Sequence, residues 1–171
     1  MEQVIDPLKP MIGLLAWQVR RGHGSFLTIE FGMPHLSVTE PIIASPDASE
    51  RVRRHLKRRR VFVSGDWHFW VQYGNWRLVT ADGFLDNNHP PGSALDECLG
   101  DLEGQKLLSV DVENASNSWT LAFDLGALLK IWPSAEIPDD LWSLYIWGGD
   151  IISCQNDGKL DIEKRNGAAS V

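Results

Sequence analysis

The chain has 171 residues, which suits one domain that buries roughly 70% of its unfolded surface and so has a sizeable core. With 43% hydrophobic and 23% charged residues, the composition excludes a wholly disordered chain. The formal net charge is −7, but residues 51–60 (RVRRHLKRRR) carry seven positive charges and no acid, which leaves −14 on the rest of the sequence. The sequence therefore describes an acidic protein with one basic segment.

The cysteines and the N-terminal residues bear on the compartment. Cys98 and Cys154 are too few for a disulfide scaffold and match no metal-ligand spacing. Residues 1–10 combine acids with two prolines, whereas a signal peptide needs a basic start and a continuous apolar run. No apolar stretch approaches the roughly 18 residues of a membrane span. The sequence thus predicts a cytoplasmic protein with reduced cysteines and no membrane contact.

The first half begins with segments that predict three strands joined as a meander. These are residues 12–19, 25–31 and 36–38, where apolar residues run together or alternate with polar ones between turn-forming glycines and prolines. Residues 45–47 (Ser-Pro-Asp) then supply a cap, a first-turn proline and a first-turn acid, which predict the start of a helix containing the basic segment. We expect this basic helix to cover a sheet edge or an outer sheet face.

The most aromatic stretch, VFVSGDWHFWVQYGNWRLVT, covers residues 61–80, where three of the eight tryptophans fall within ten residues. His68 and Trp70 share one face of an alternating segment, opposite Phe69 and Val71, which is the two-residue period of a strand. A Gly-Asn pair then interrupts the alternation, which resumes at the next tryptophan. This pattern predicts a β-hairpin.

The second half repeats blocks of the first. Residues 81–92 are rich in Asp, Asn, Gly and Pro, which predicts an exposed loop, and Ser93 is the expected cap of a second short helix. Four later blocks then match four earlier ones in the same order: 107–112, 121–126, 129–131 and 142–146 match 14–19, 27–32, 36–38 and 67–71. The sequence predicts a single domain, 1–171, with an internal duplication whose halves, 12–80 and 105–154, are linked by the loop and short helix 81–104.

Both halves are expected to contain about five strands, and the polar tail from Asn156 is expected to be frayed. Each half-sheet has one strongly apolar face, and packing two such faces together is the simplest way to bury both. The predicted fold class is therefore α+β, mainly antiparallel β, with two similar β-rich halves packed as a sandwich or half-open barrel and with two helices.

Two groups of side chains are candidates for binding. The candidates are His68, Trp70, Arg58, Arg59, Arg60 and Trp76. The face that carries Trp70 is either covered by a helix or exposed for a partner, whereas most of the tryptophans have the strand spacing of core residues. The arginines could neutralise phosphates beside tryptophans that stack on bases, but the acidic remainder of the chain would repel a polyanion. Nucleic acid is therefore a less favoured partner than protein.

Catalytic and metal-binding motifs are missing from the sequence. It has no Gly-x-Ser-x-Gly elbow, no phosphate loop and no dinucleotide fingerprint, and no pair of histidines has the spacing of metal ligands. We therefore expect no catalytic residue, no metal and no cofactor. The alternative is a small-molecule-binding protein or enzyme with a site in the β core, built from Asp66, His68 or Trp70.

Several motifs resemble those of an uncharacterised bacterial family of small β-rich cytosolic proteins, similar to immunity-like proteins of toxin systems. They are Phe-Gly before Leu-x-Val (residues 31–38), Gly-Asp-Trp-His-Phe-Trp-Val (65–71), and Leu-Glu-Gly-Gln-Lys-Leu followed by Phe-Asp-Leu-Gly-x-Leu-Leu (102–129). The resemblance implies a non-catalytic protein that binds, and so neutralises, a toxin. Its motifs are structural, so no site residue is carried over, and the oligomeric state is left open.

Overall fold

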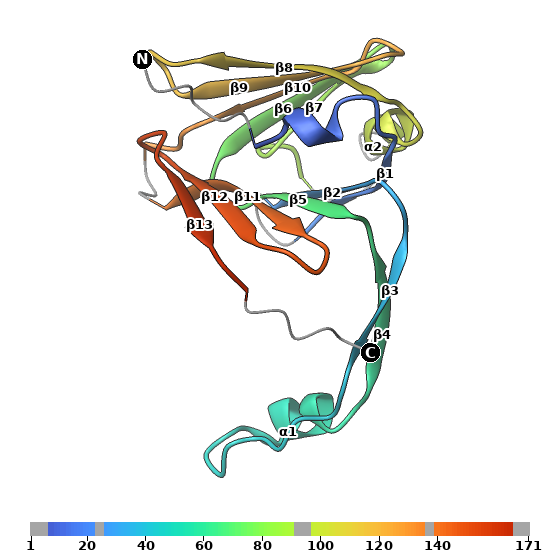
Figure 1. The fold of residues 1–171 in the computed structure, drawn as a ribbon, viewed down its shortest axis with the longest axis vertical. Coiled ribbons are helices and arrows are strands. Elements are labelled where there is room, and N and C mark those ends of the chain that lie inside the picture. The colour runs from blue at the N-terminus through green and yellow to red at the C-terminus, as the bar shows by residue number, and fades with distance from the viewer. Residues whose placement is uncertain (1–6, 23–25, 91–96, 136–138, 166–171) are drawn as a thin grey trace.

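The computed structural model describes residues 7–22, 26–90, 97–135 and 139–165. Within these residues, one six-stranded and one five-stranded antiparallel sheet lie face to face as two layers, and a two-stranded arm projects away from them (Figure 1). The hydrophobic side chains of both sheets form one shared core. The sheets are not closed into a barrel, so the fold is a sandwich, and the predicted class of mainly antiparallel α+β is confirmed.

The six-stranded sheet has the order β1-β2-β5-β11-β12-β13. Its strands are β1 (Ala16–Arg21), β2 (Leu27–Phe31), β5 (Trp67–Val71), β11 (Asp140–Ile146), β12 (Ile151–Gln155) and β13 (Leu160–Glu163). Because successive side chains of a strand point to opposite faces, Leu27, Ile29 and Phe31 enter the core, whereas Thr28 and Glu30 lie on the outer face of the sheet.

The five-stranded sheet has the order β7-β6-β10-β9-β8. Its strands are β7 (Gly83–Asp86), β6 (Asn75–Thr80), β10 (Leu128–Trp132), β9 (Ser118–Phe123) and β8 (Leu107–Glu113). Alternation again selects the core residues, because Trp76 and Leu78 of β6 and Leu129 and Ile131 of β10 are completely buried. The outer face of this sheet carries polar residues such as Arg77.

Two short helices pack against the sandwich. The 3-10 helix η1 (Lys9–Met11) contacts β8, and α2 (Glu97–Leu102) contacts β1, β6 and β7 (Figure 1). The buried side chains of α2 are Cys98, Leu99 and Leu102, so this helix joins strands of both sheets. Its predicted cap, Ser93, lies outside the described residues.

The arm, residues 35–64, departs from a simple sandwich. Its strands β3 (His35–Thr39) and β4 (Arg60–Ser64) pair with each other, and α1 (Glu50–Leu56) stands at their far end (Figure 1). The strands on either side of the arm, β2 and β5, are direct neighbours in the six-stranded sheet, with Phe31 opposite Trp67. The arm is therefore a long insertion at a place where a short turn would suffice.

The aromatic stretch at residues 61–80 does not form the predicted hairpin. Its three strands lie in three different sheets: β4 in the arm, β5 in the six-stranded sheet and β6 in the five-stranded sheet. The chain changes layer at Gly74, where a Cβ atom would lie 2.5 Å from Leu141 Cδ1 and 3.0 Å from Leu141 O. Glycine is thus required by the close approach of β11, which alternation alone cannot reveal.

Other boundaries also differ from the predictions. The basic helix begins at Glu50 with Ser49 as its cap, and it stands on the arm instead of covering a sheet. β7 occupies part of the predicted loop, and β13 occupies part of the predicted frayed tail. β7 pairs along β6, and β13 pairs along β12. This cross-strand pairing stabilises the two strands, which their own sequences do not predict.

The predicted repeat matches the topology in part. The pairs β1-β2 and β8-β9 occupy corresponding places, each at the edge of one sheet. The third match fails, because β3 lies in the arm whereas β10 lies inside the five-stranded sheet. By position, β5 is the counterpart of β10, since each is the next neighbour of the second strand. The duplication itself stays a prediction.

Candidate functional site

The arm exposes an unusual amount of hydrophobic surface. Its exposed large hydrophobic residues are Leu36, Ile42, Ile43, Val52, Val61, Phe62 and Val63. Ile43 is 97% exposed and Phe62 is 52% exposed. The cause is architectural, because a two-stranded ribbon has no second layer to bury either of its faces. An exposed apolar surface that polar groups surround is typical of an interaction site.

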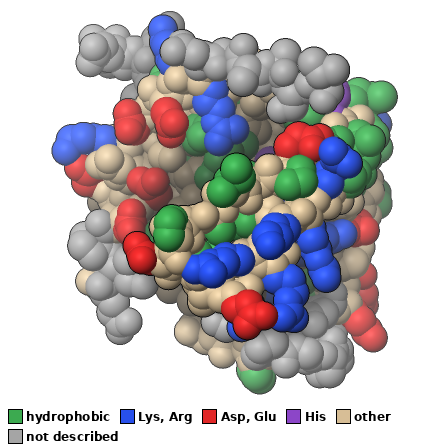
Figure 2. Space-filling view, turned by 90° about the horizontal axis from the view of Figure 1, so that it is seen from below, with side chains coloured by type: hydrophobic (Ala, Val, Ile, Leu, Met, Phe, Trp, Pro, Cys, Tyr) green, Lys and Arg blue, Asp and Glu red, His purple; other side chains and the backbone are tan. Residues whose placement is uncertain are grey.

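The arm is also basic, in contrast to the rest of the chain. It carries seven Lys and Arg against three acids, a net charge of +4, which leaves −11 on the other residues. In Figure 2, which views the molecule from the arm side, basic and hydrophobic side chains mix along the arm, and acidic side chains gather on the body beside it. The arm therefore differs from the body in both charge and hydrophobic exposure.

The three arginines predicted to bind a partner have different surroundings. Arg59 forms a bidentate pair with Glu40, at 2.8 to 3.0 Å, and this arginine lowers the pKa of the Glu40 carboxyl. Arg60 Nη1 lies 3.3 Å from His55 Nε2. Arg58 is exposed beside α1. All three are on the arm, and exposed ion pairs such as that of Arg59 contribute little stability, so they remain available to a partner.

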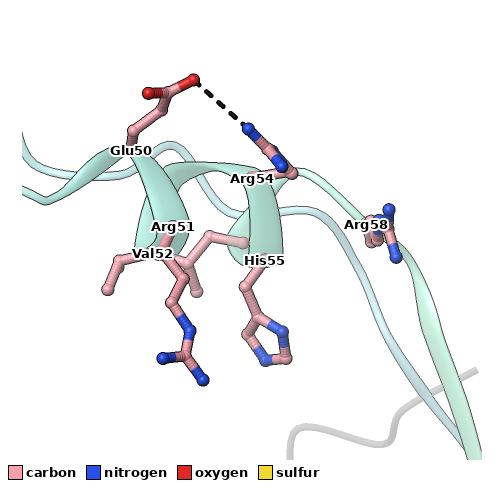
Figure 3. A pocket seen from close by; sticks show the side chains of 7 residues that line it. Glu50, Arg51, Val52, Arg54, His55 and Arg58 are labelled. Carbon is pink, nitrogen blue, oxygen red and sulfur yellow. Dashed lines mark hydrogen bonds and ion pairs between the residues drawn. The ribbon is translucent and has the colours of Figure 1, made fainter.

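Two hollows on the arm differ in character. The larger, about 780 Å³, is lined by α1 residues that point to opposite sides of the helix, with Glu50 and Arg54 on one side and Arg51 and His55 on the other (Figure 3). It is therefore open surface and not an enclosed ligand site. The smaller, about 260 Å³, has apolar walls from residues 41–44 and cationic neighbours in Arg53 and Lys57.

Asp66 fixes one side of the root of the arm. Its carboxylate accepts hydrogen bonds from Met33 N at 2.7 Å and from His35 Nε2 at 2.6 Å, and its backbone oxygen accepts one from Trp147 N. The His35 ring stacks on Trp147 with centroids 4.6 Å apart and planes 5° from parallel. The bond from His35, followed by that from Met33 N, lowers the pKa of Asp66. These contacts tie β3 to the end of β11.

Glu30 fixes the other side of the root. Its side chain is only 7% exposed, and its carboxylate accepts hydrogen bonds from Gly65 N at 2.7 Å and His68 Nδ1 at 2.5 Å. A Cβ atom at Gly65 would lie 3.0 Å from Phe31 N and closer still to Phe31 O, so only glycine fits where the chain returns from the arm. Glu30 and Asp66 together hold both strands of the arm in one direction.

Trp70 lies on the outer face of the six-stranded sheet. Its ring contacts Phe26 edge-to-face at 5.4 Å and lies 6.1 Å from the ring of Tyr145, and the guanidinium of Arg165 lies 5.8 Å from the centre of that tyrosine ring. Trp70 is half-buried, and within the described residues its buried Nε1 has no hydrogen-bond partner. The sequence left two alternatives for this face, namely cover by a helix or exposure to a partner. Among the described residues no helix covers it, and the rings of Phe26 and Tyr145 cover Trp70 in part.

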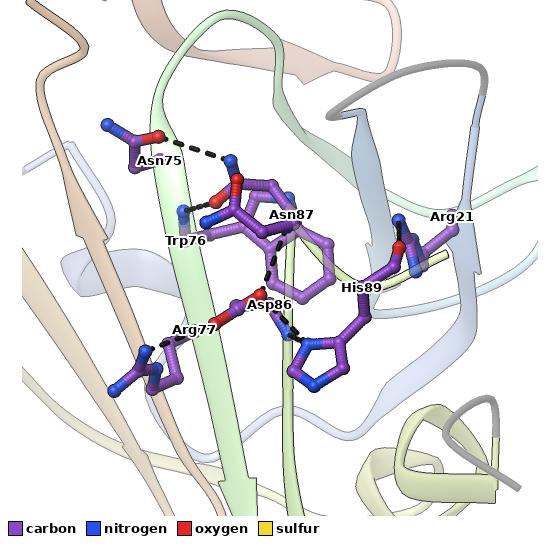
Figure 4. A network of polar contacts seen from close by, with 8 residues as sticks. Arg21, Asn75, Trp76, Arg77, Asp86, Asn87 and His89 are labelled. Carbon is purple, nitrogen blue, oxygen red and sulfur yellow. Dashed lines mark hydrogen bonds and ion pairs between the residues drawn. The ribbon is translucent and has the colours of Figure 1, made fainter. Parts of the chain in front are cut away.

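Trp76 is not part of a binding surface, because it is completely buried in the core. It supports a polar network that joins the two sheets (Figure 4). Arg21 of β1 lies 5.7 Å above the Trp76 ring and donates to His89 O, and His89 Nδ1 lies 2.8 Å from Asp86 Oδ1. Burial would raise the pKa of Asp86, but hydrogen bonds from Asn88 N and the Arg77 and His89 side chains bring it below its usual value. This network is structural.

The candidate residues therefore separate into three places: the arginines on the arm, His68 and Trp70 on the outer face of the six-stranded sheet, and Trp76 in the core. A pocket on which Asp66, His68 or Trp70 converged would favour the small-molecule alternative, whereas His68 pairs with Glu30 and Asp66 pairs with His35. Each carboxylate thus orients one histidine at the root of the arm, which is a positioning arrangement.

The sequence analysis missed Glu30 and His35 and the exposed apolar residues of the arm. A polar residue on the outer face of a strand has no sequence signal for burial, so Glu30 was indistinguishable from a solvated glutamate. Of the exposed hydrophobic residues, Leu36, Val61, Phe62 and Val63 lie on β3 and β4, and within the described residues no second sheet packs against this ribbon.

Comparison with protein-family models, with curated protein sequences and with solved structures found no match. Within residues 7–22, 26–90, 97–135 and 139–165, no helix has the length and hydrophobicity needed to cross a membrane. The case for a function therefore depends on the arm and its root.

Proposed function

We propose that this chain is a non-catalytic protein-binding module that engages a partner through its basic, apolar arm. The single observation that carries the proposal is the exposed hydrophobic surface on an arm whose direction is fixed at its root. A loop that served only to connect β2 and β5 would need neither the length nor the two carboxylate contacts at its base.

The chemistry of the arm specifies the partner surface. Exposed side chains such as Ile43 and Phe62 supply apolar contact area, and the net charge of +4 favours an acidic partner and accelerates its approach. A toxin that is neutralised by binding fits this description and agrees with the immunity-like resemblance of the sequence. The smaller hollow beside Lys57 would receive one of its apolar side chains.

A nucleic-acid partner has less support. Its binding model needs cations and stacking tryptophans on one surface, but the cations lie on the arm, Trp70 lies on the body and Trp76 is buried. In a mobility-shift assay with single-stranded DNA and RNA, we expect no salt-dependent binding. A nucleic-acid partner would instead give salt-dependent binding that the substitutions Arg58→Ala, Arg59→Ala and Arg60→Ala remove.

The test is co-expression of the tagged chain with the products of neighbouring genes. A deletion of residues 33–65 removes the arm and leaves Gly32-Asp66 as a two-residue turn, for which the φ of +79° at Gly32 is suitable. The intact chain is expected to copurify with a partner and the deletion variant is not. For a toxin, only the intact chain should restore growth. A partner that binds both forms equally, or no bound product at all, would refute the proposal.

A further inference from the structure

The arm has surface to bury even when no partner is present. β3 and β4 make their extensive contacts with each other, and in the described residues no other strand lies beside either of them. Two-stranded ribbons are marginally stable in water unless they pack on something else. The exposed side chains of Leu36, Val61 and Phe62 lie on these strands, so a surface that covered them would stabilise the arm.

The body carries a surface whose charge complements the arm. Asp139, Asp140, Asp161 and Glu163 lie on β11 or β13 or beside them, toward the edge that β13 forms. Burial, then the charges of Asp139 and Asp161, raise the pKa of Asp140, as expected for carboxylates held close together. Lys164 and Arg165, which directly follow Glu163 in the chain, offset part of this charge. The cluster lies on the six-stranded sheet, from which the arm also projects.

An arm does not reach the acidic cluster of its own chain. The arm leaves the sheet between β2 and β5, and β13 lies three strands beyond β5, about 14 Å away at the usual strand spacing. The arm also points away from the sandwich (Figure 1), and its root is fixed by Glu30 and Asp66. The acidic cluster that an arm can meet is therefore that of a second molecule.

We propose that two copies of this chain form a symmetric dimer in which the arm of each lies against the acidic, β13 side of the other. A two-fold axis makes each arm-to-body contact occur twice, so that two modest surfaces act together. This inference goes beyond the proposed function, because it states what covers the arm before another partner binds, and either idea can fail alone.

Sedimentation equilibrium at low salt tests the dimer. At about 100 µM protein, a dimer with a micromolar Kd would be populated, and its Kd should rise with salt concentration. The arm deletion of residues 33–65 should be monomeric. The milder Lys57→Glu/Arg58→Glu variant should weaken the dimer at least about tenfold while keeping the arm. As a control with the same charge change, Lys106→Glu/Lys130→Glu, at exposed positions just before β8 and on β10, should leave the Kd unchanged.

A charge-swap experiment identifies the surfaces in contact. Asp161→Lys/Glu163→Lys alone should weaken the dimer as Lys57→Glu/Arg58→Glu does, and an equimolar mixture of the two variants should form a heterodimer with restored affinity, because both of its contacts are then complementary. An intact chain that is monomeric at about 100 µM would overturn the inference. So would a dimer that survives arm deletion, or a mixture in which affinity is not restored.

Discussion

Glu30 at the root of the arm gives the most direct test of the structural argument. Glu30→Ala removes the acceptor of two hydrogen bonds and leaves the N–H of Gly65 and Nδ1 of His68 without a partner. A buried donor without an acceptor costs about 1–3 kcal/mol, and His68 is partly open to water, so we expect a loss of about 2–4 kcal/mol. This is a large share of the roughly 5–15 kcal/mol that stabilises a typical domain.

Urea unfolding, followed by tryptophan fluorescence, measures this loss, and the corresponding decrease in Tm is about 4–16 °C for a chain of this size. Glu30→Gln keeps one acceptor and should fall between the wild type and Glu30→Ala. Thr28→Ala, on the same face of the same strand, removes only an exposed 3.5 Å hydrogen bond and should cost about 0.5 kcal/mol or less. Amide exchange at Gly65 should accelerate in Glu30→Ala. If Glu30→Ala costs no more than Thr28→Ala, the account of the root is wrong.

Three further predictions follow from burial and charge. The lowered pKa of Asp66 contributes stability above about pH 4 that is lost as the pH falls through the folded-state pKa, so Asp66→Asn should flatten the loss of stability between about pH 5 and pH 3 in urea titrations, and an unchanged pH profile would contradict the contacts of Asp66. Trp76→Ala should cost about 3–5 kcal/mol, at least twice the cost of Trp70→Ala, and equal costs would contradict the burial of Trp76. Burial raises the pKa of Cys154 to about 12, so iodoacetamide should label this thiol far more slowly in native than in unfolded protein, and rapid native labelling would contradict its environment.

The sequence is sufficient to predict most of the strands, but not β7 or β13 and not the sheet that each strand joins. The buried residues of β2, β6 and β10 recur at every second position, and this local pattern defines a strand and its core face. The partner of a strand depends on residues far away in the sequence. Thus β5 and β6 were predicted to pair with each other, but Leu141 of β11 packs where Gly74 lacks a side chain, and the two strands enter different sheets.

The site was predicted in part for the same reason. The basic segment and Trp70 are prominent in the sequence, and both are accessible in the fold. Trp76 alternates with Leu78 and Thr80 on the face of β6 that is buried against the other sheet, whereas Trp70 shares its face with His68. The roles of Glu30 and Asp66 depend on folding, which brings the two ends of the arm together. Met33 and Asp66, for example, are 33 residues apart in the sequence and form a hydrogen bond.

The distribution of strands between the two sheets also sets the order in which the chain can fold. β1, β2 and β5 share a sheet with β11, β12 and β13, so the six-stranded sheet stays incomplete until β13, which begins more than 130 residues after the start of β2, has been synthesised. Such non-local pairing folds slowly and leaves apolar strands exposed in the meantime. β3, α1 and β4, in contrast, are contiguous in sequence, so the whole arm is synthesised long before Trp147, which stacks on His35 at its root, and before the sandwich that carries it.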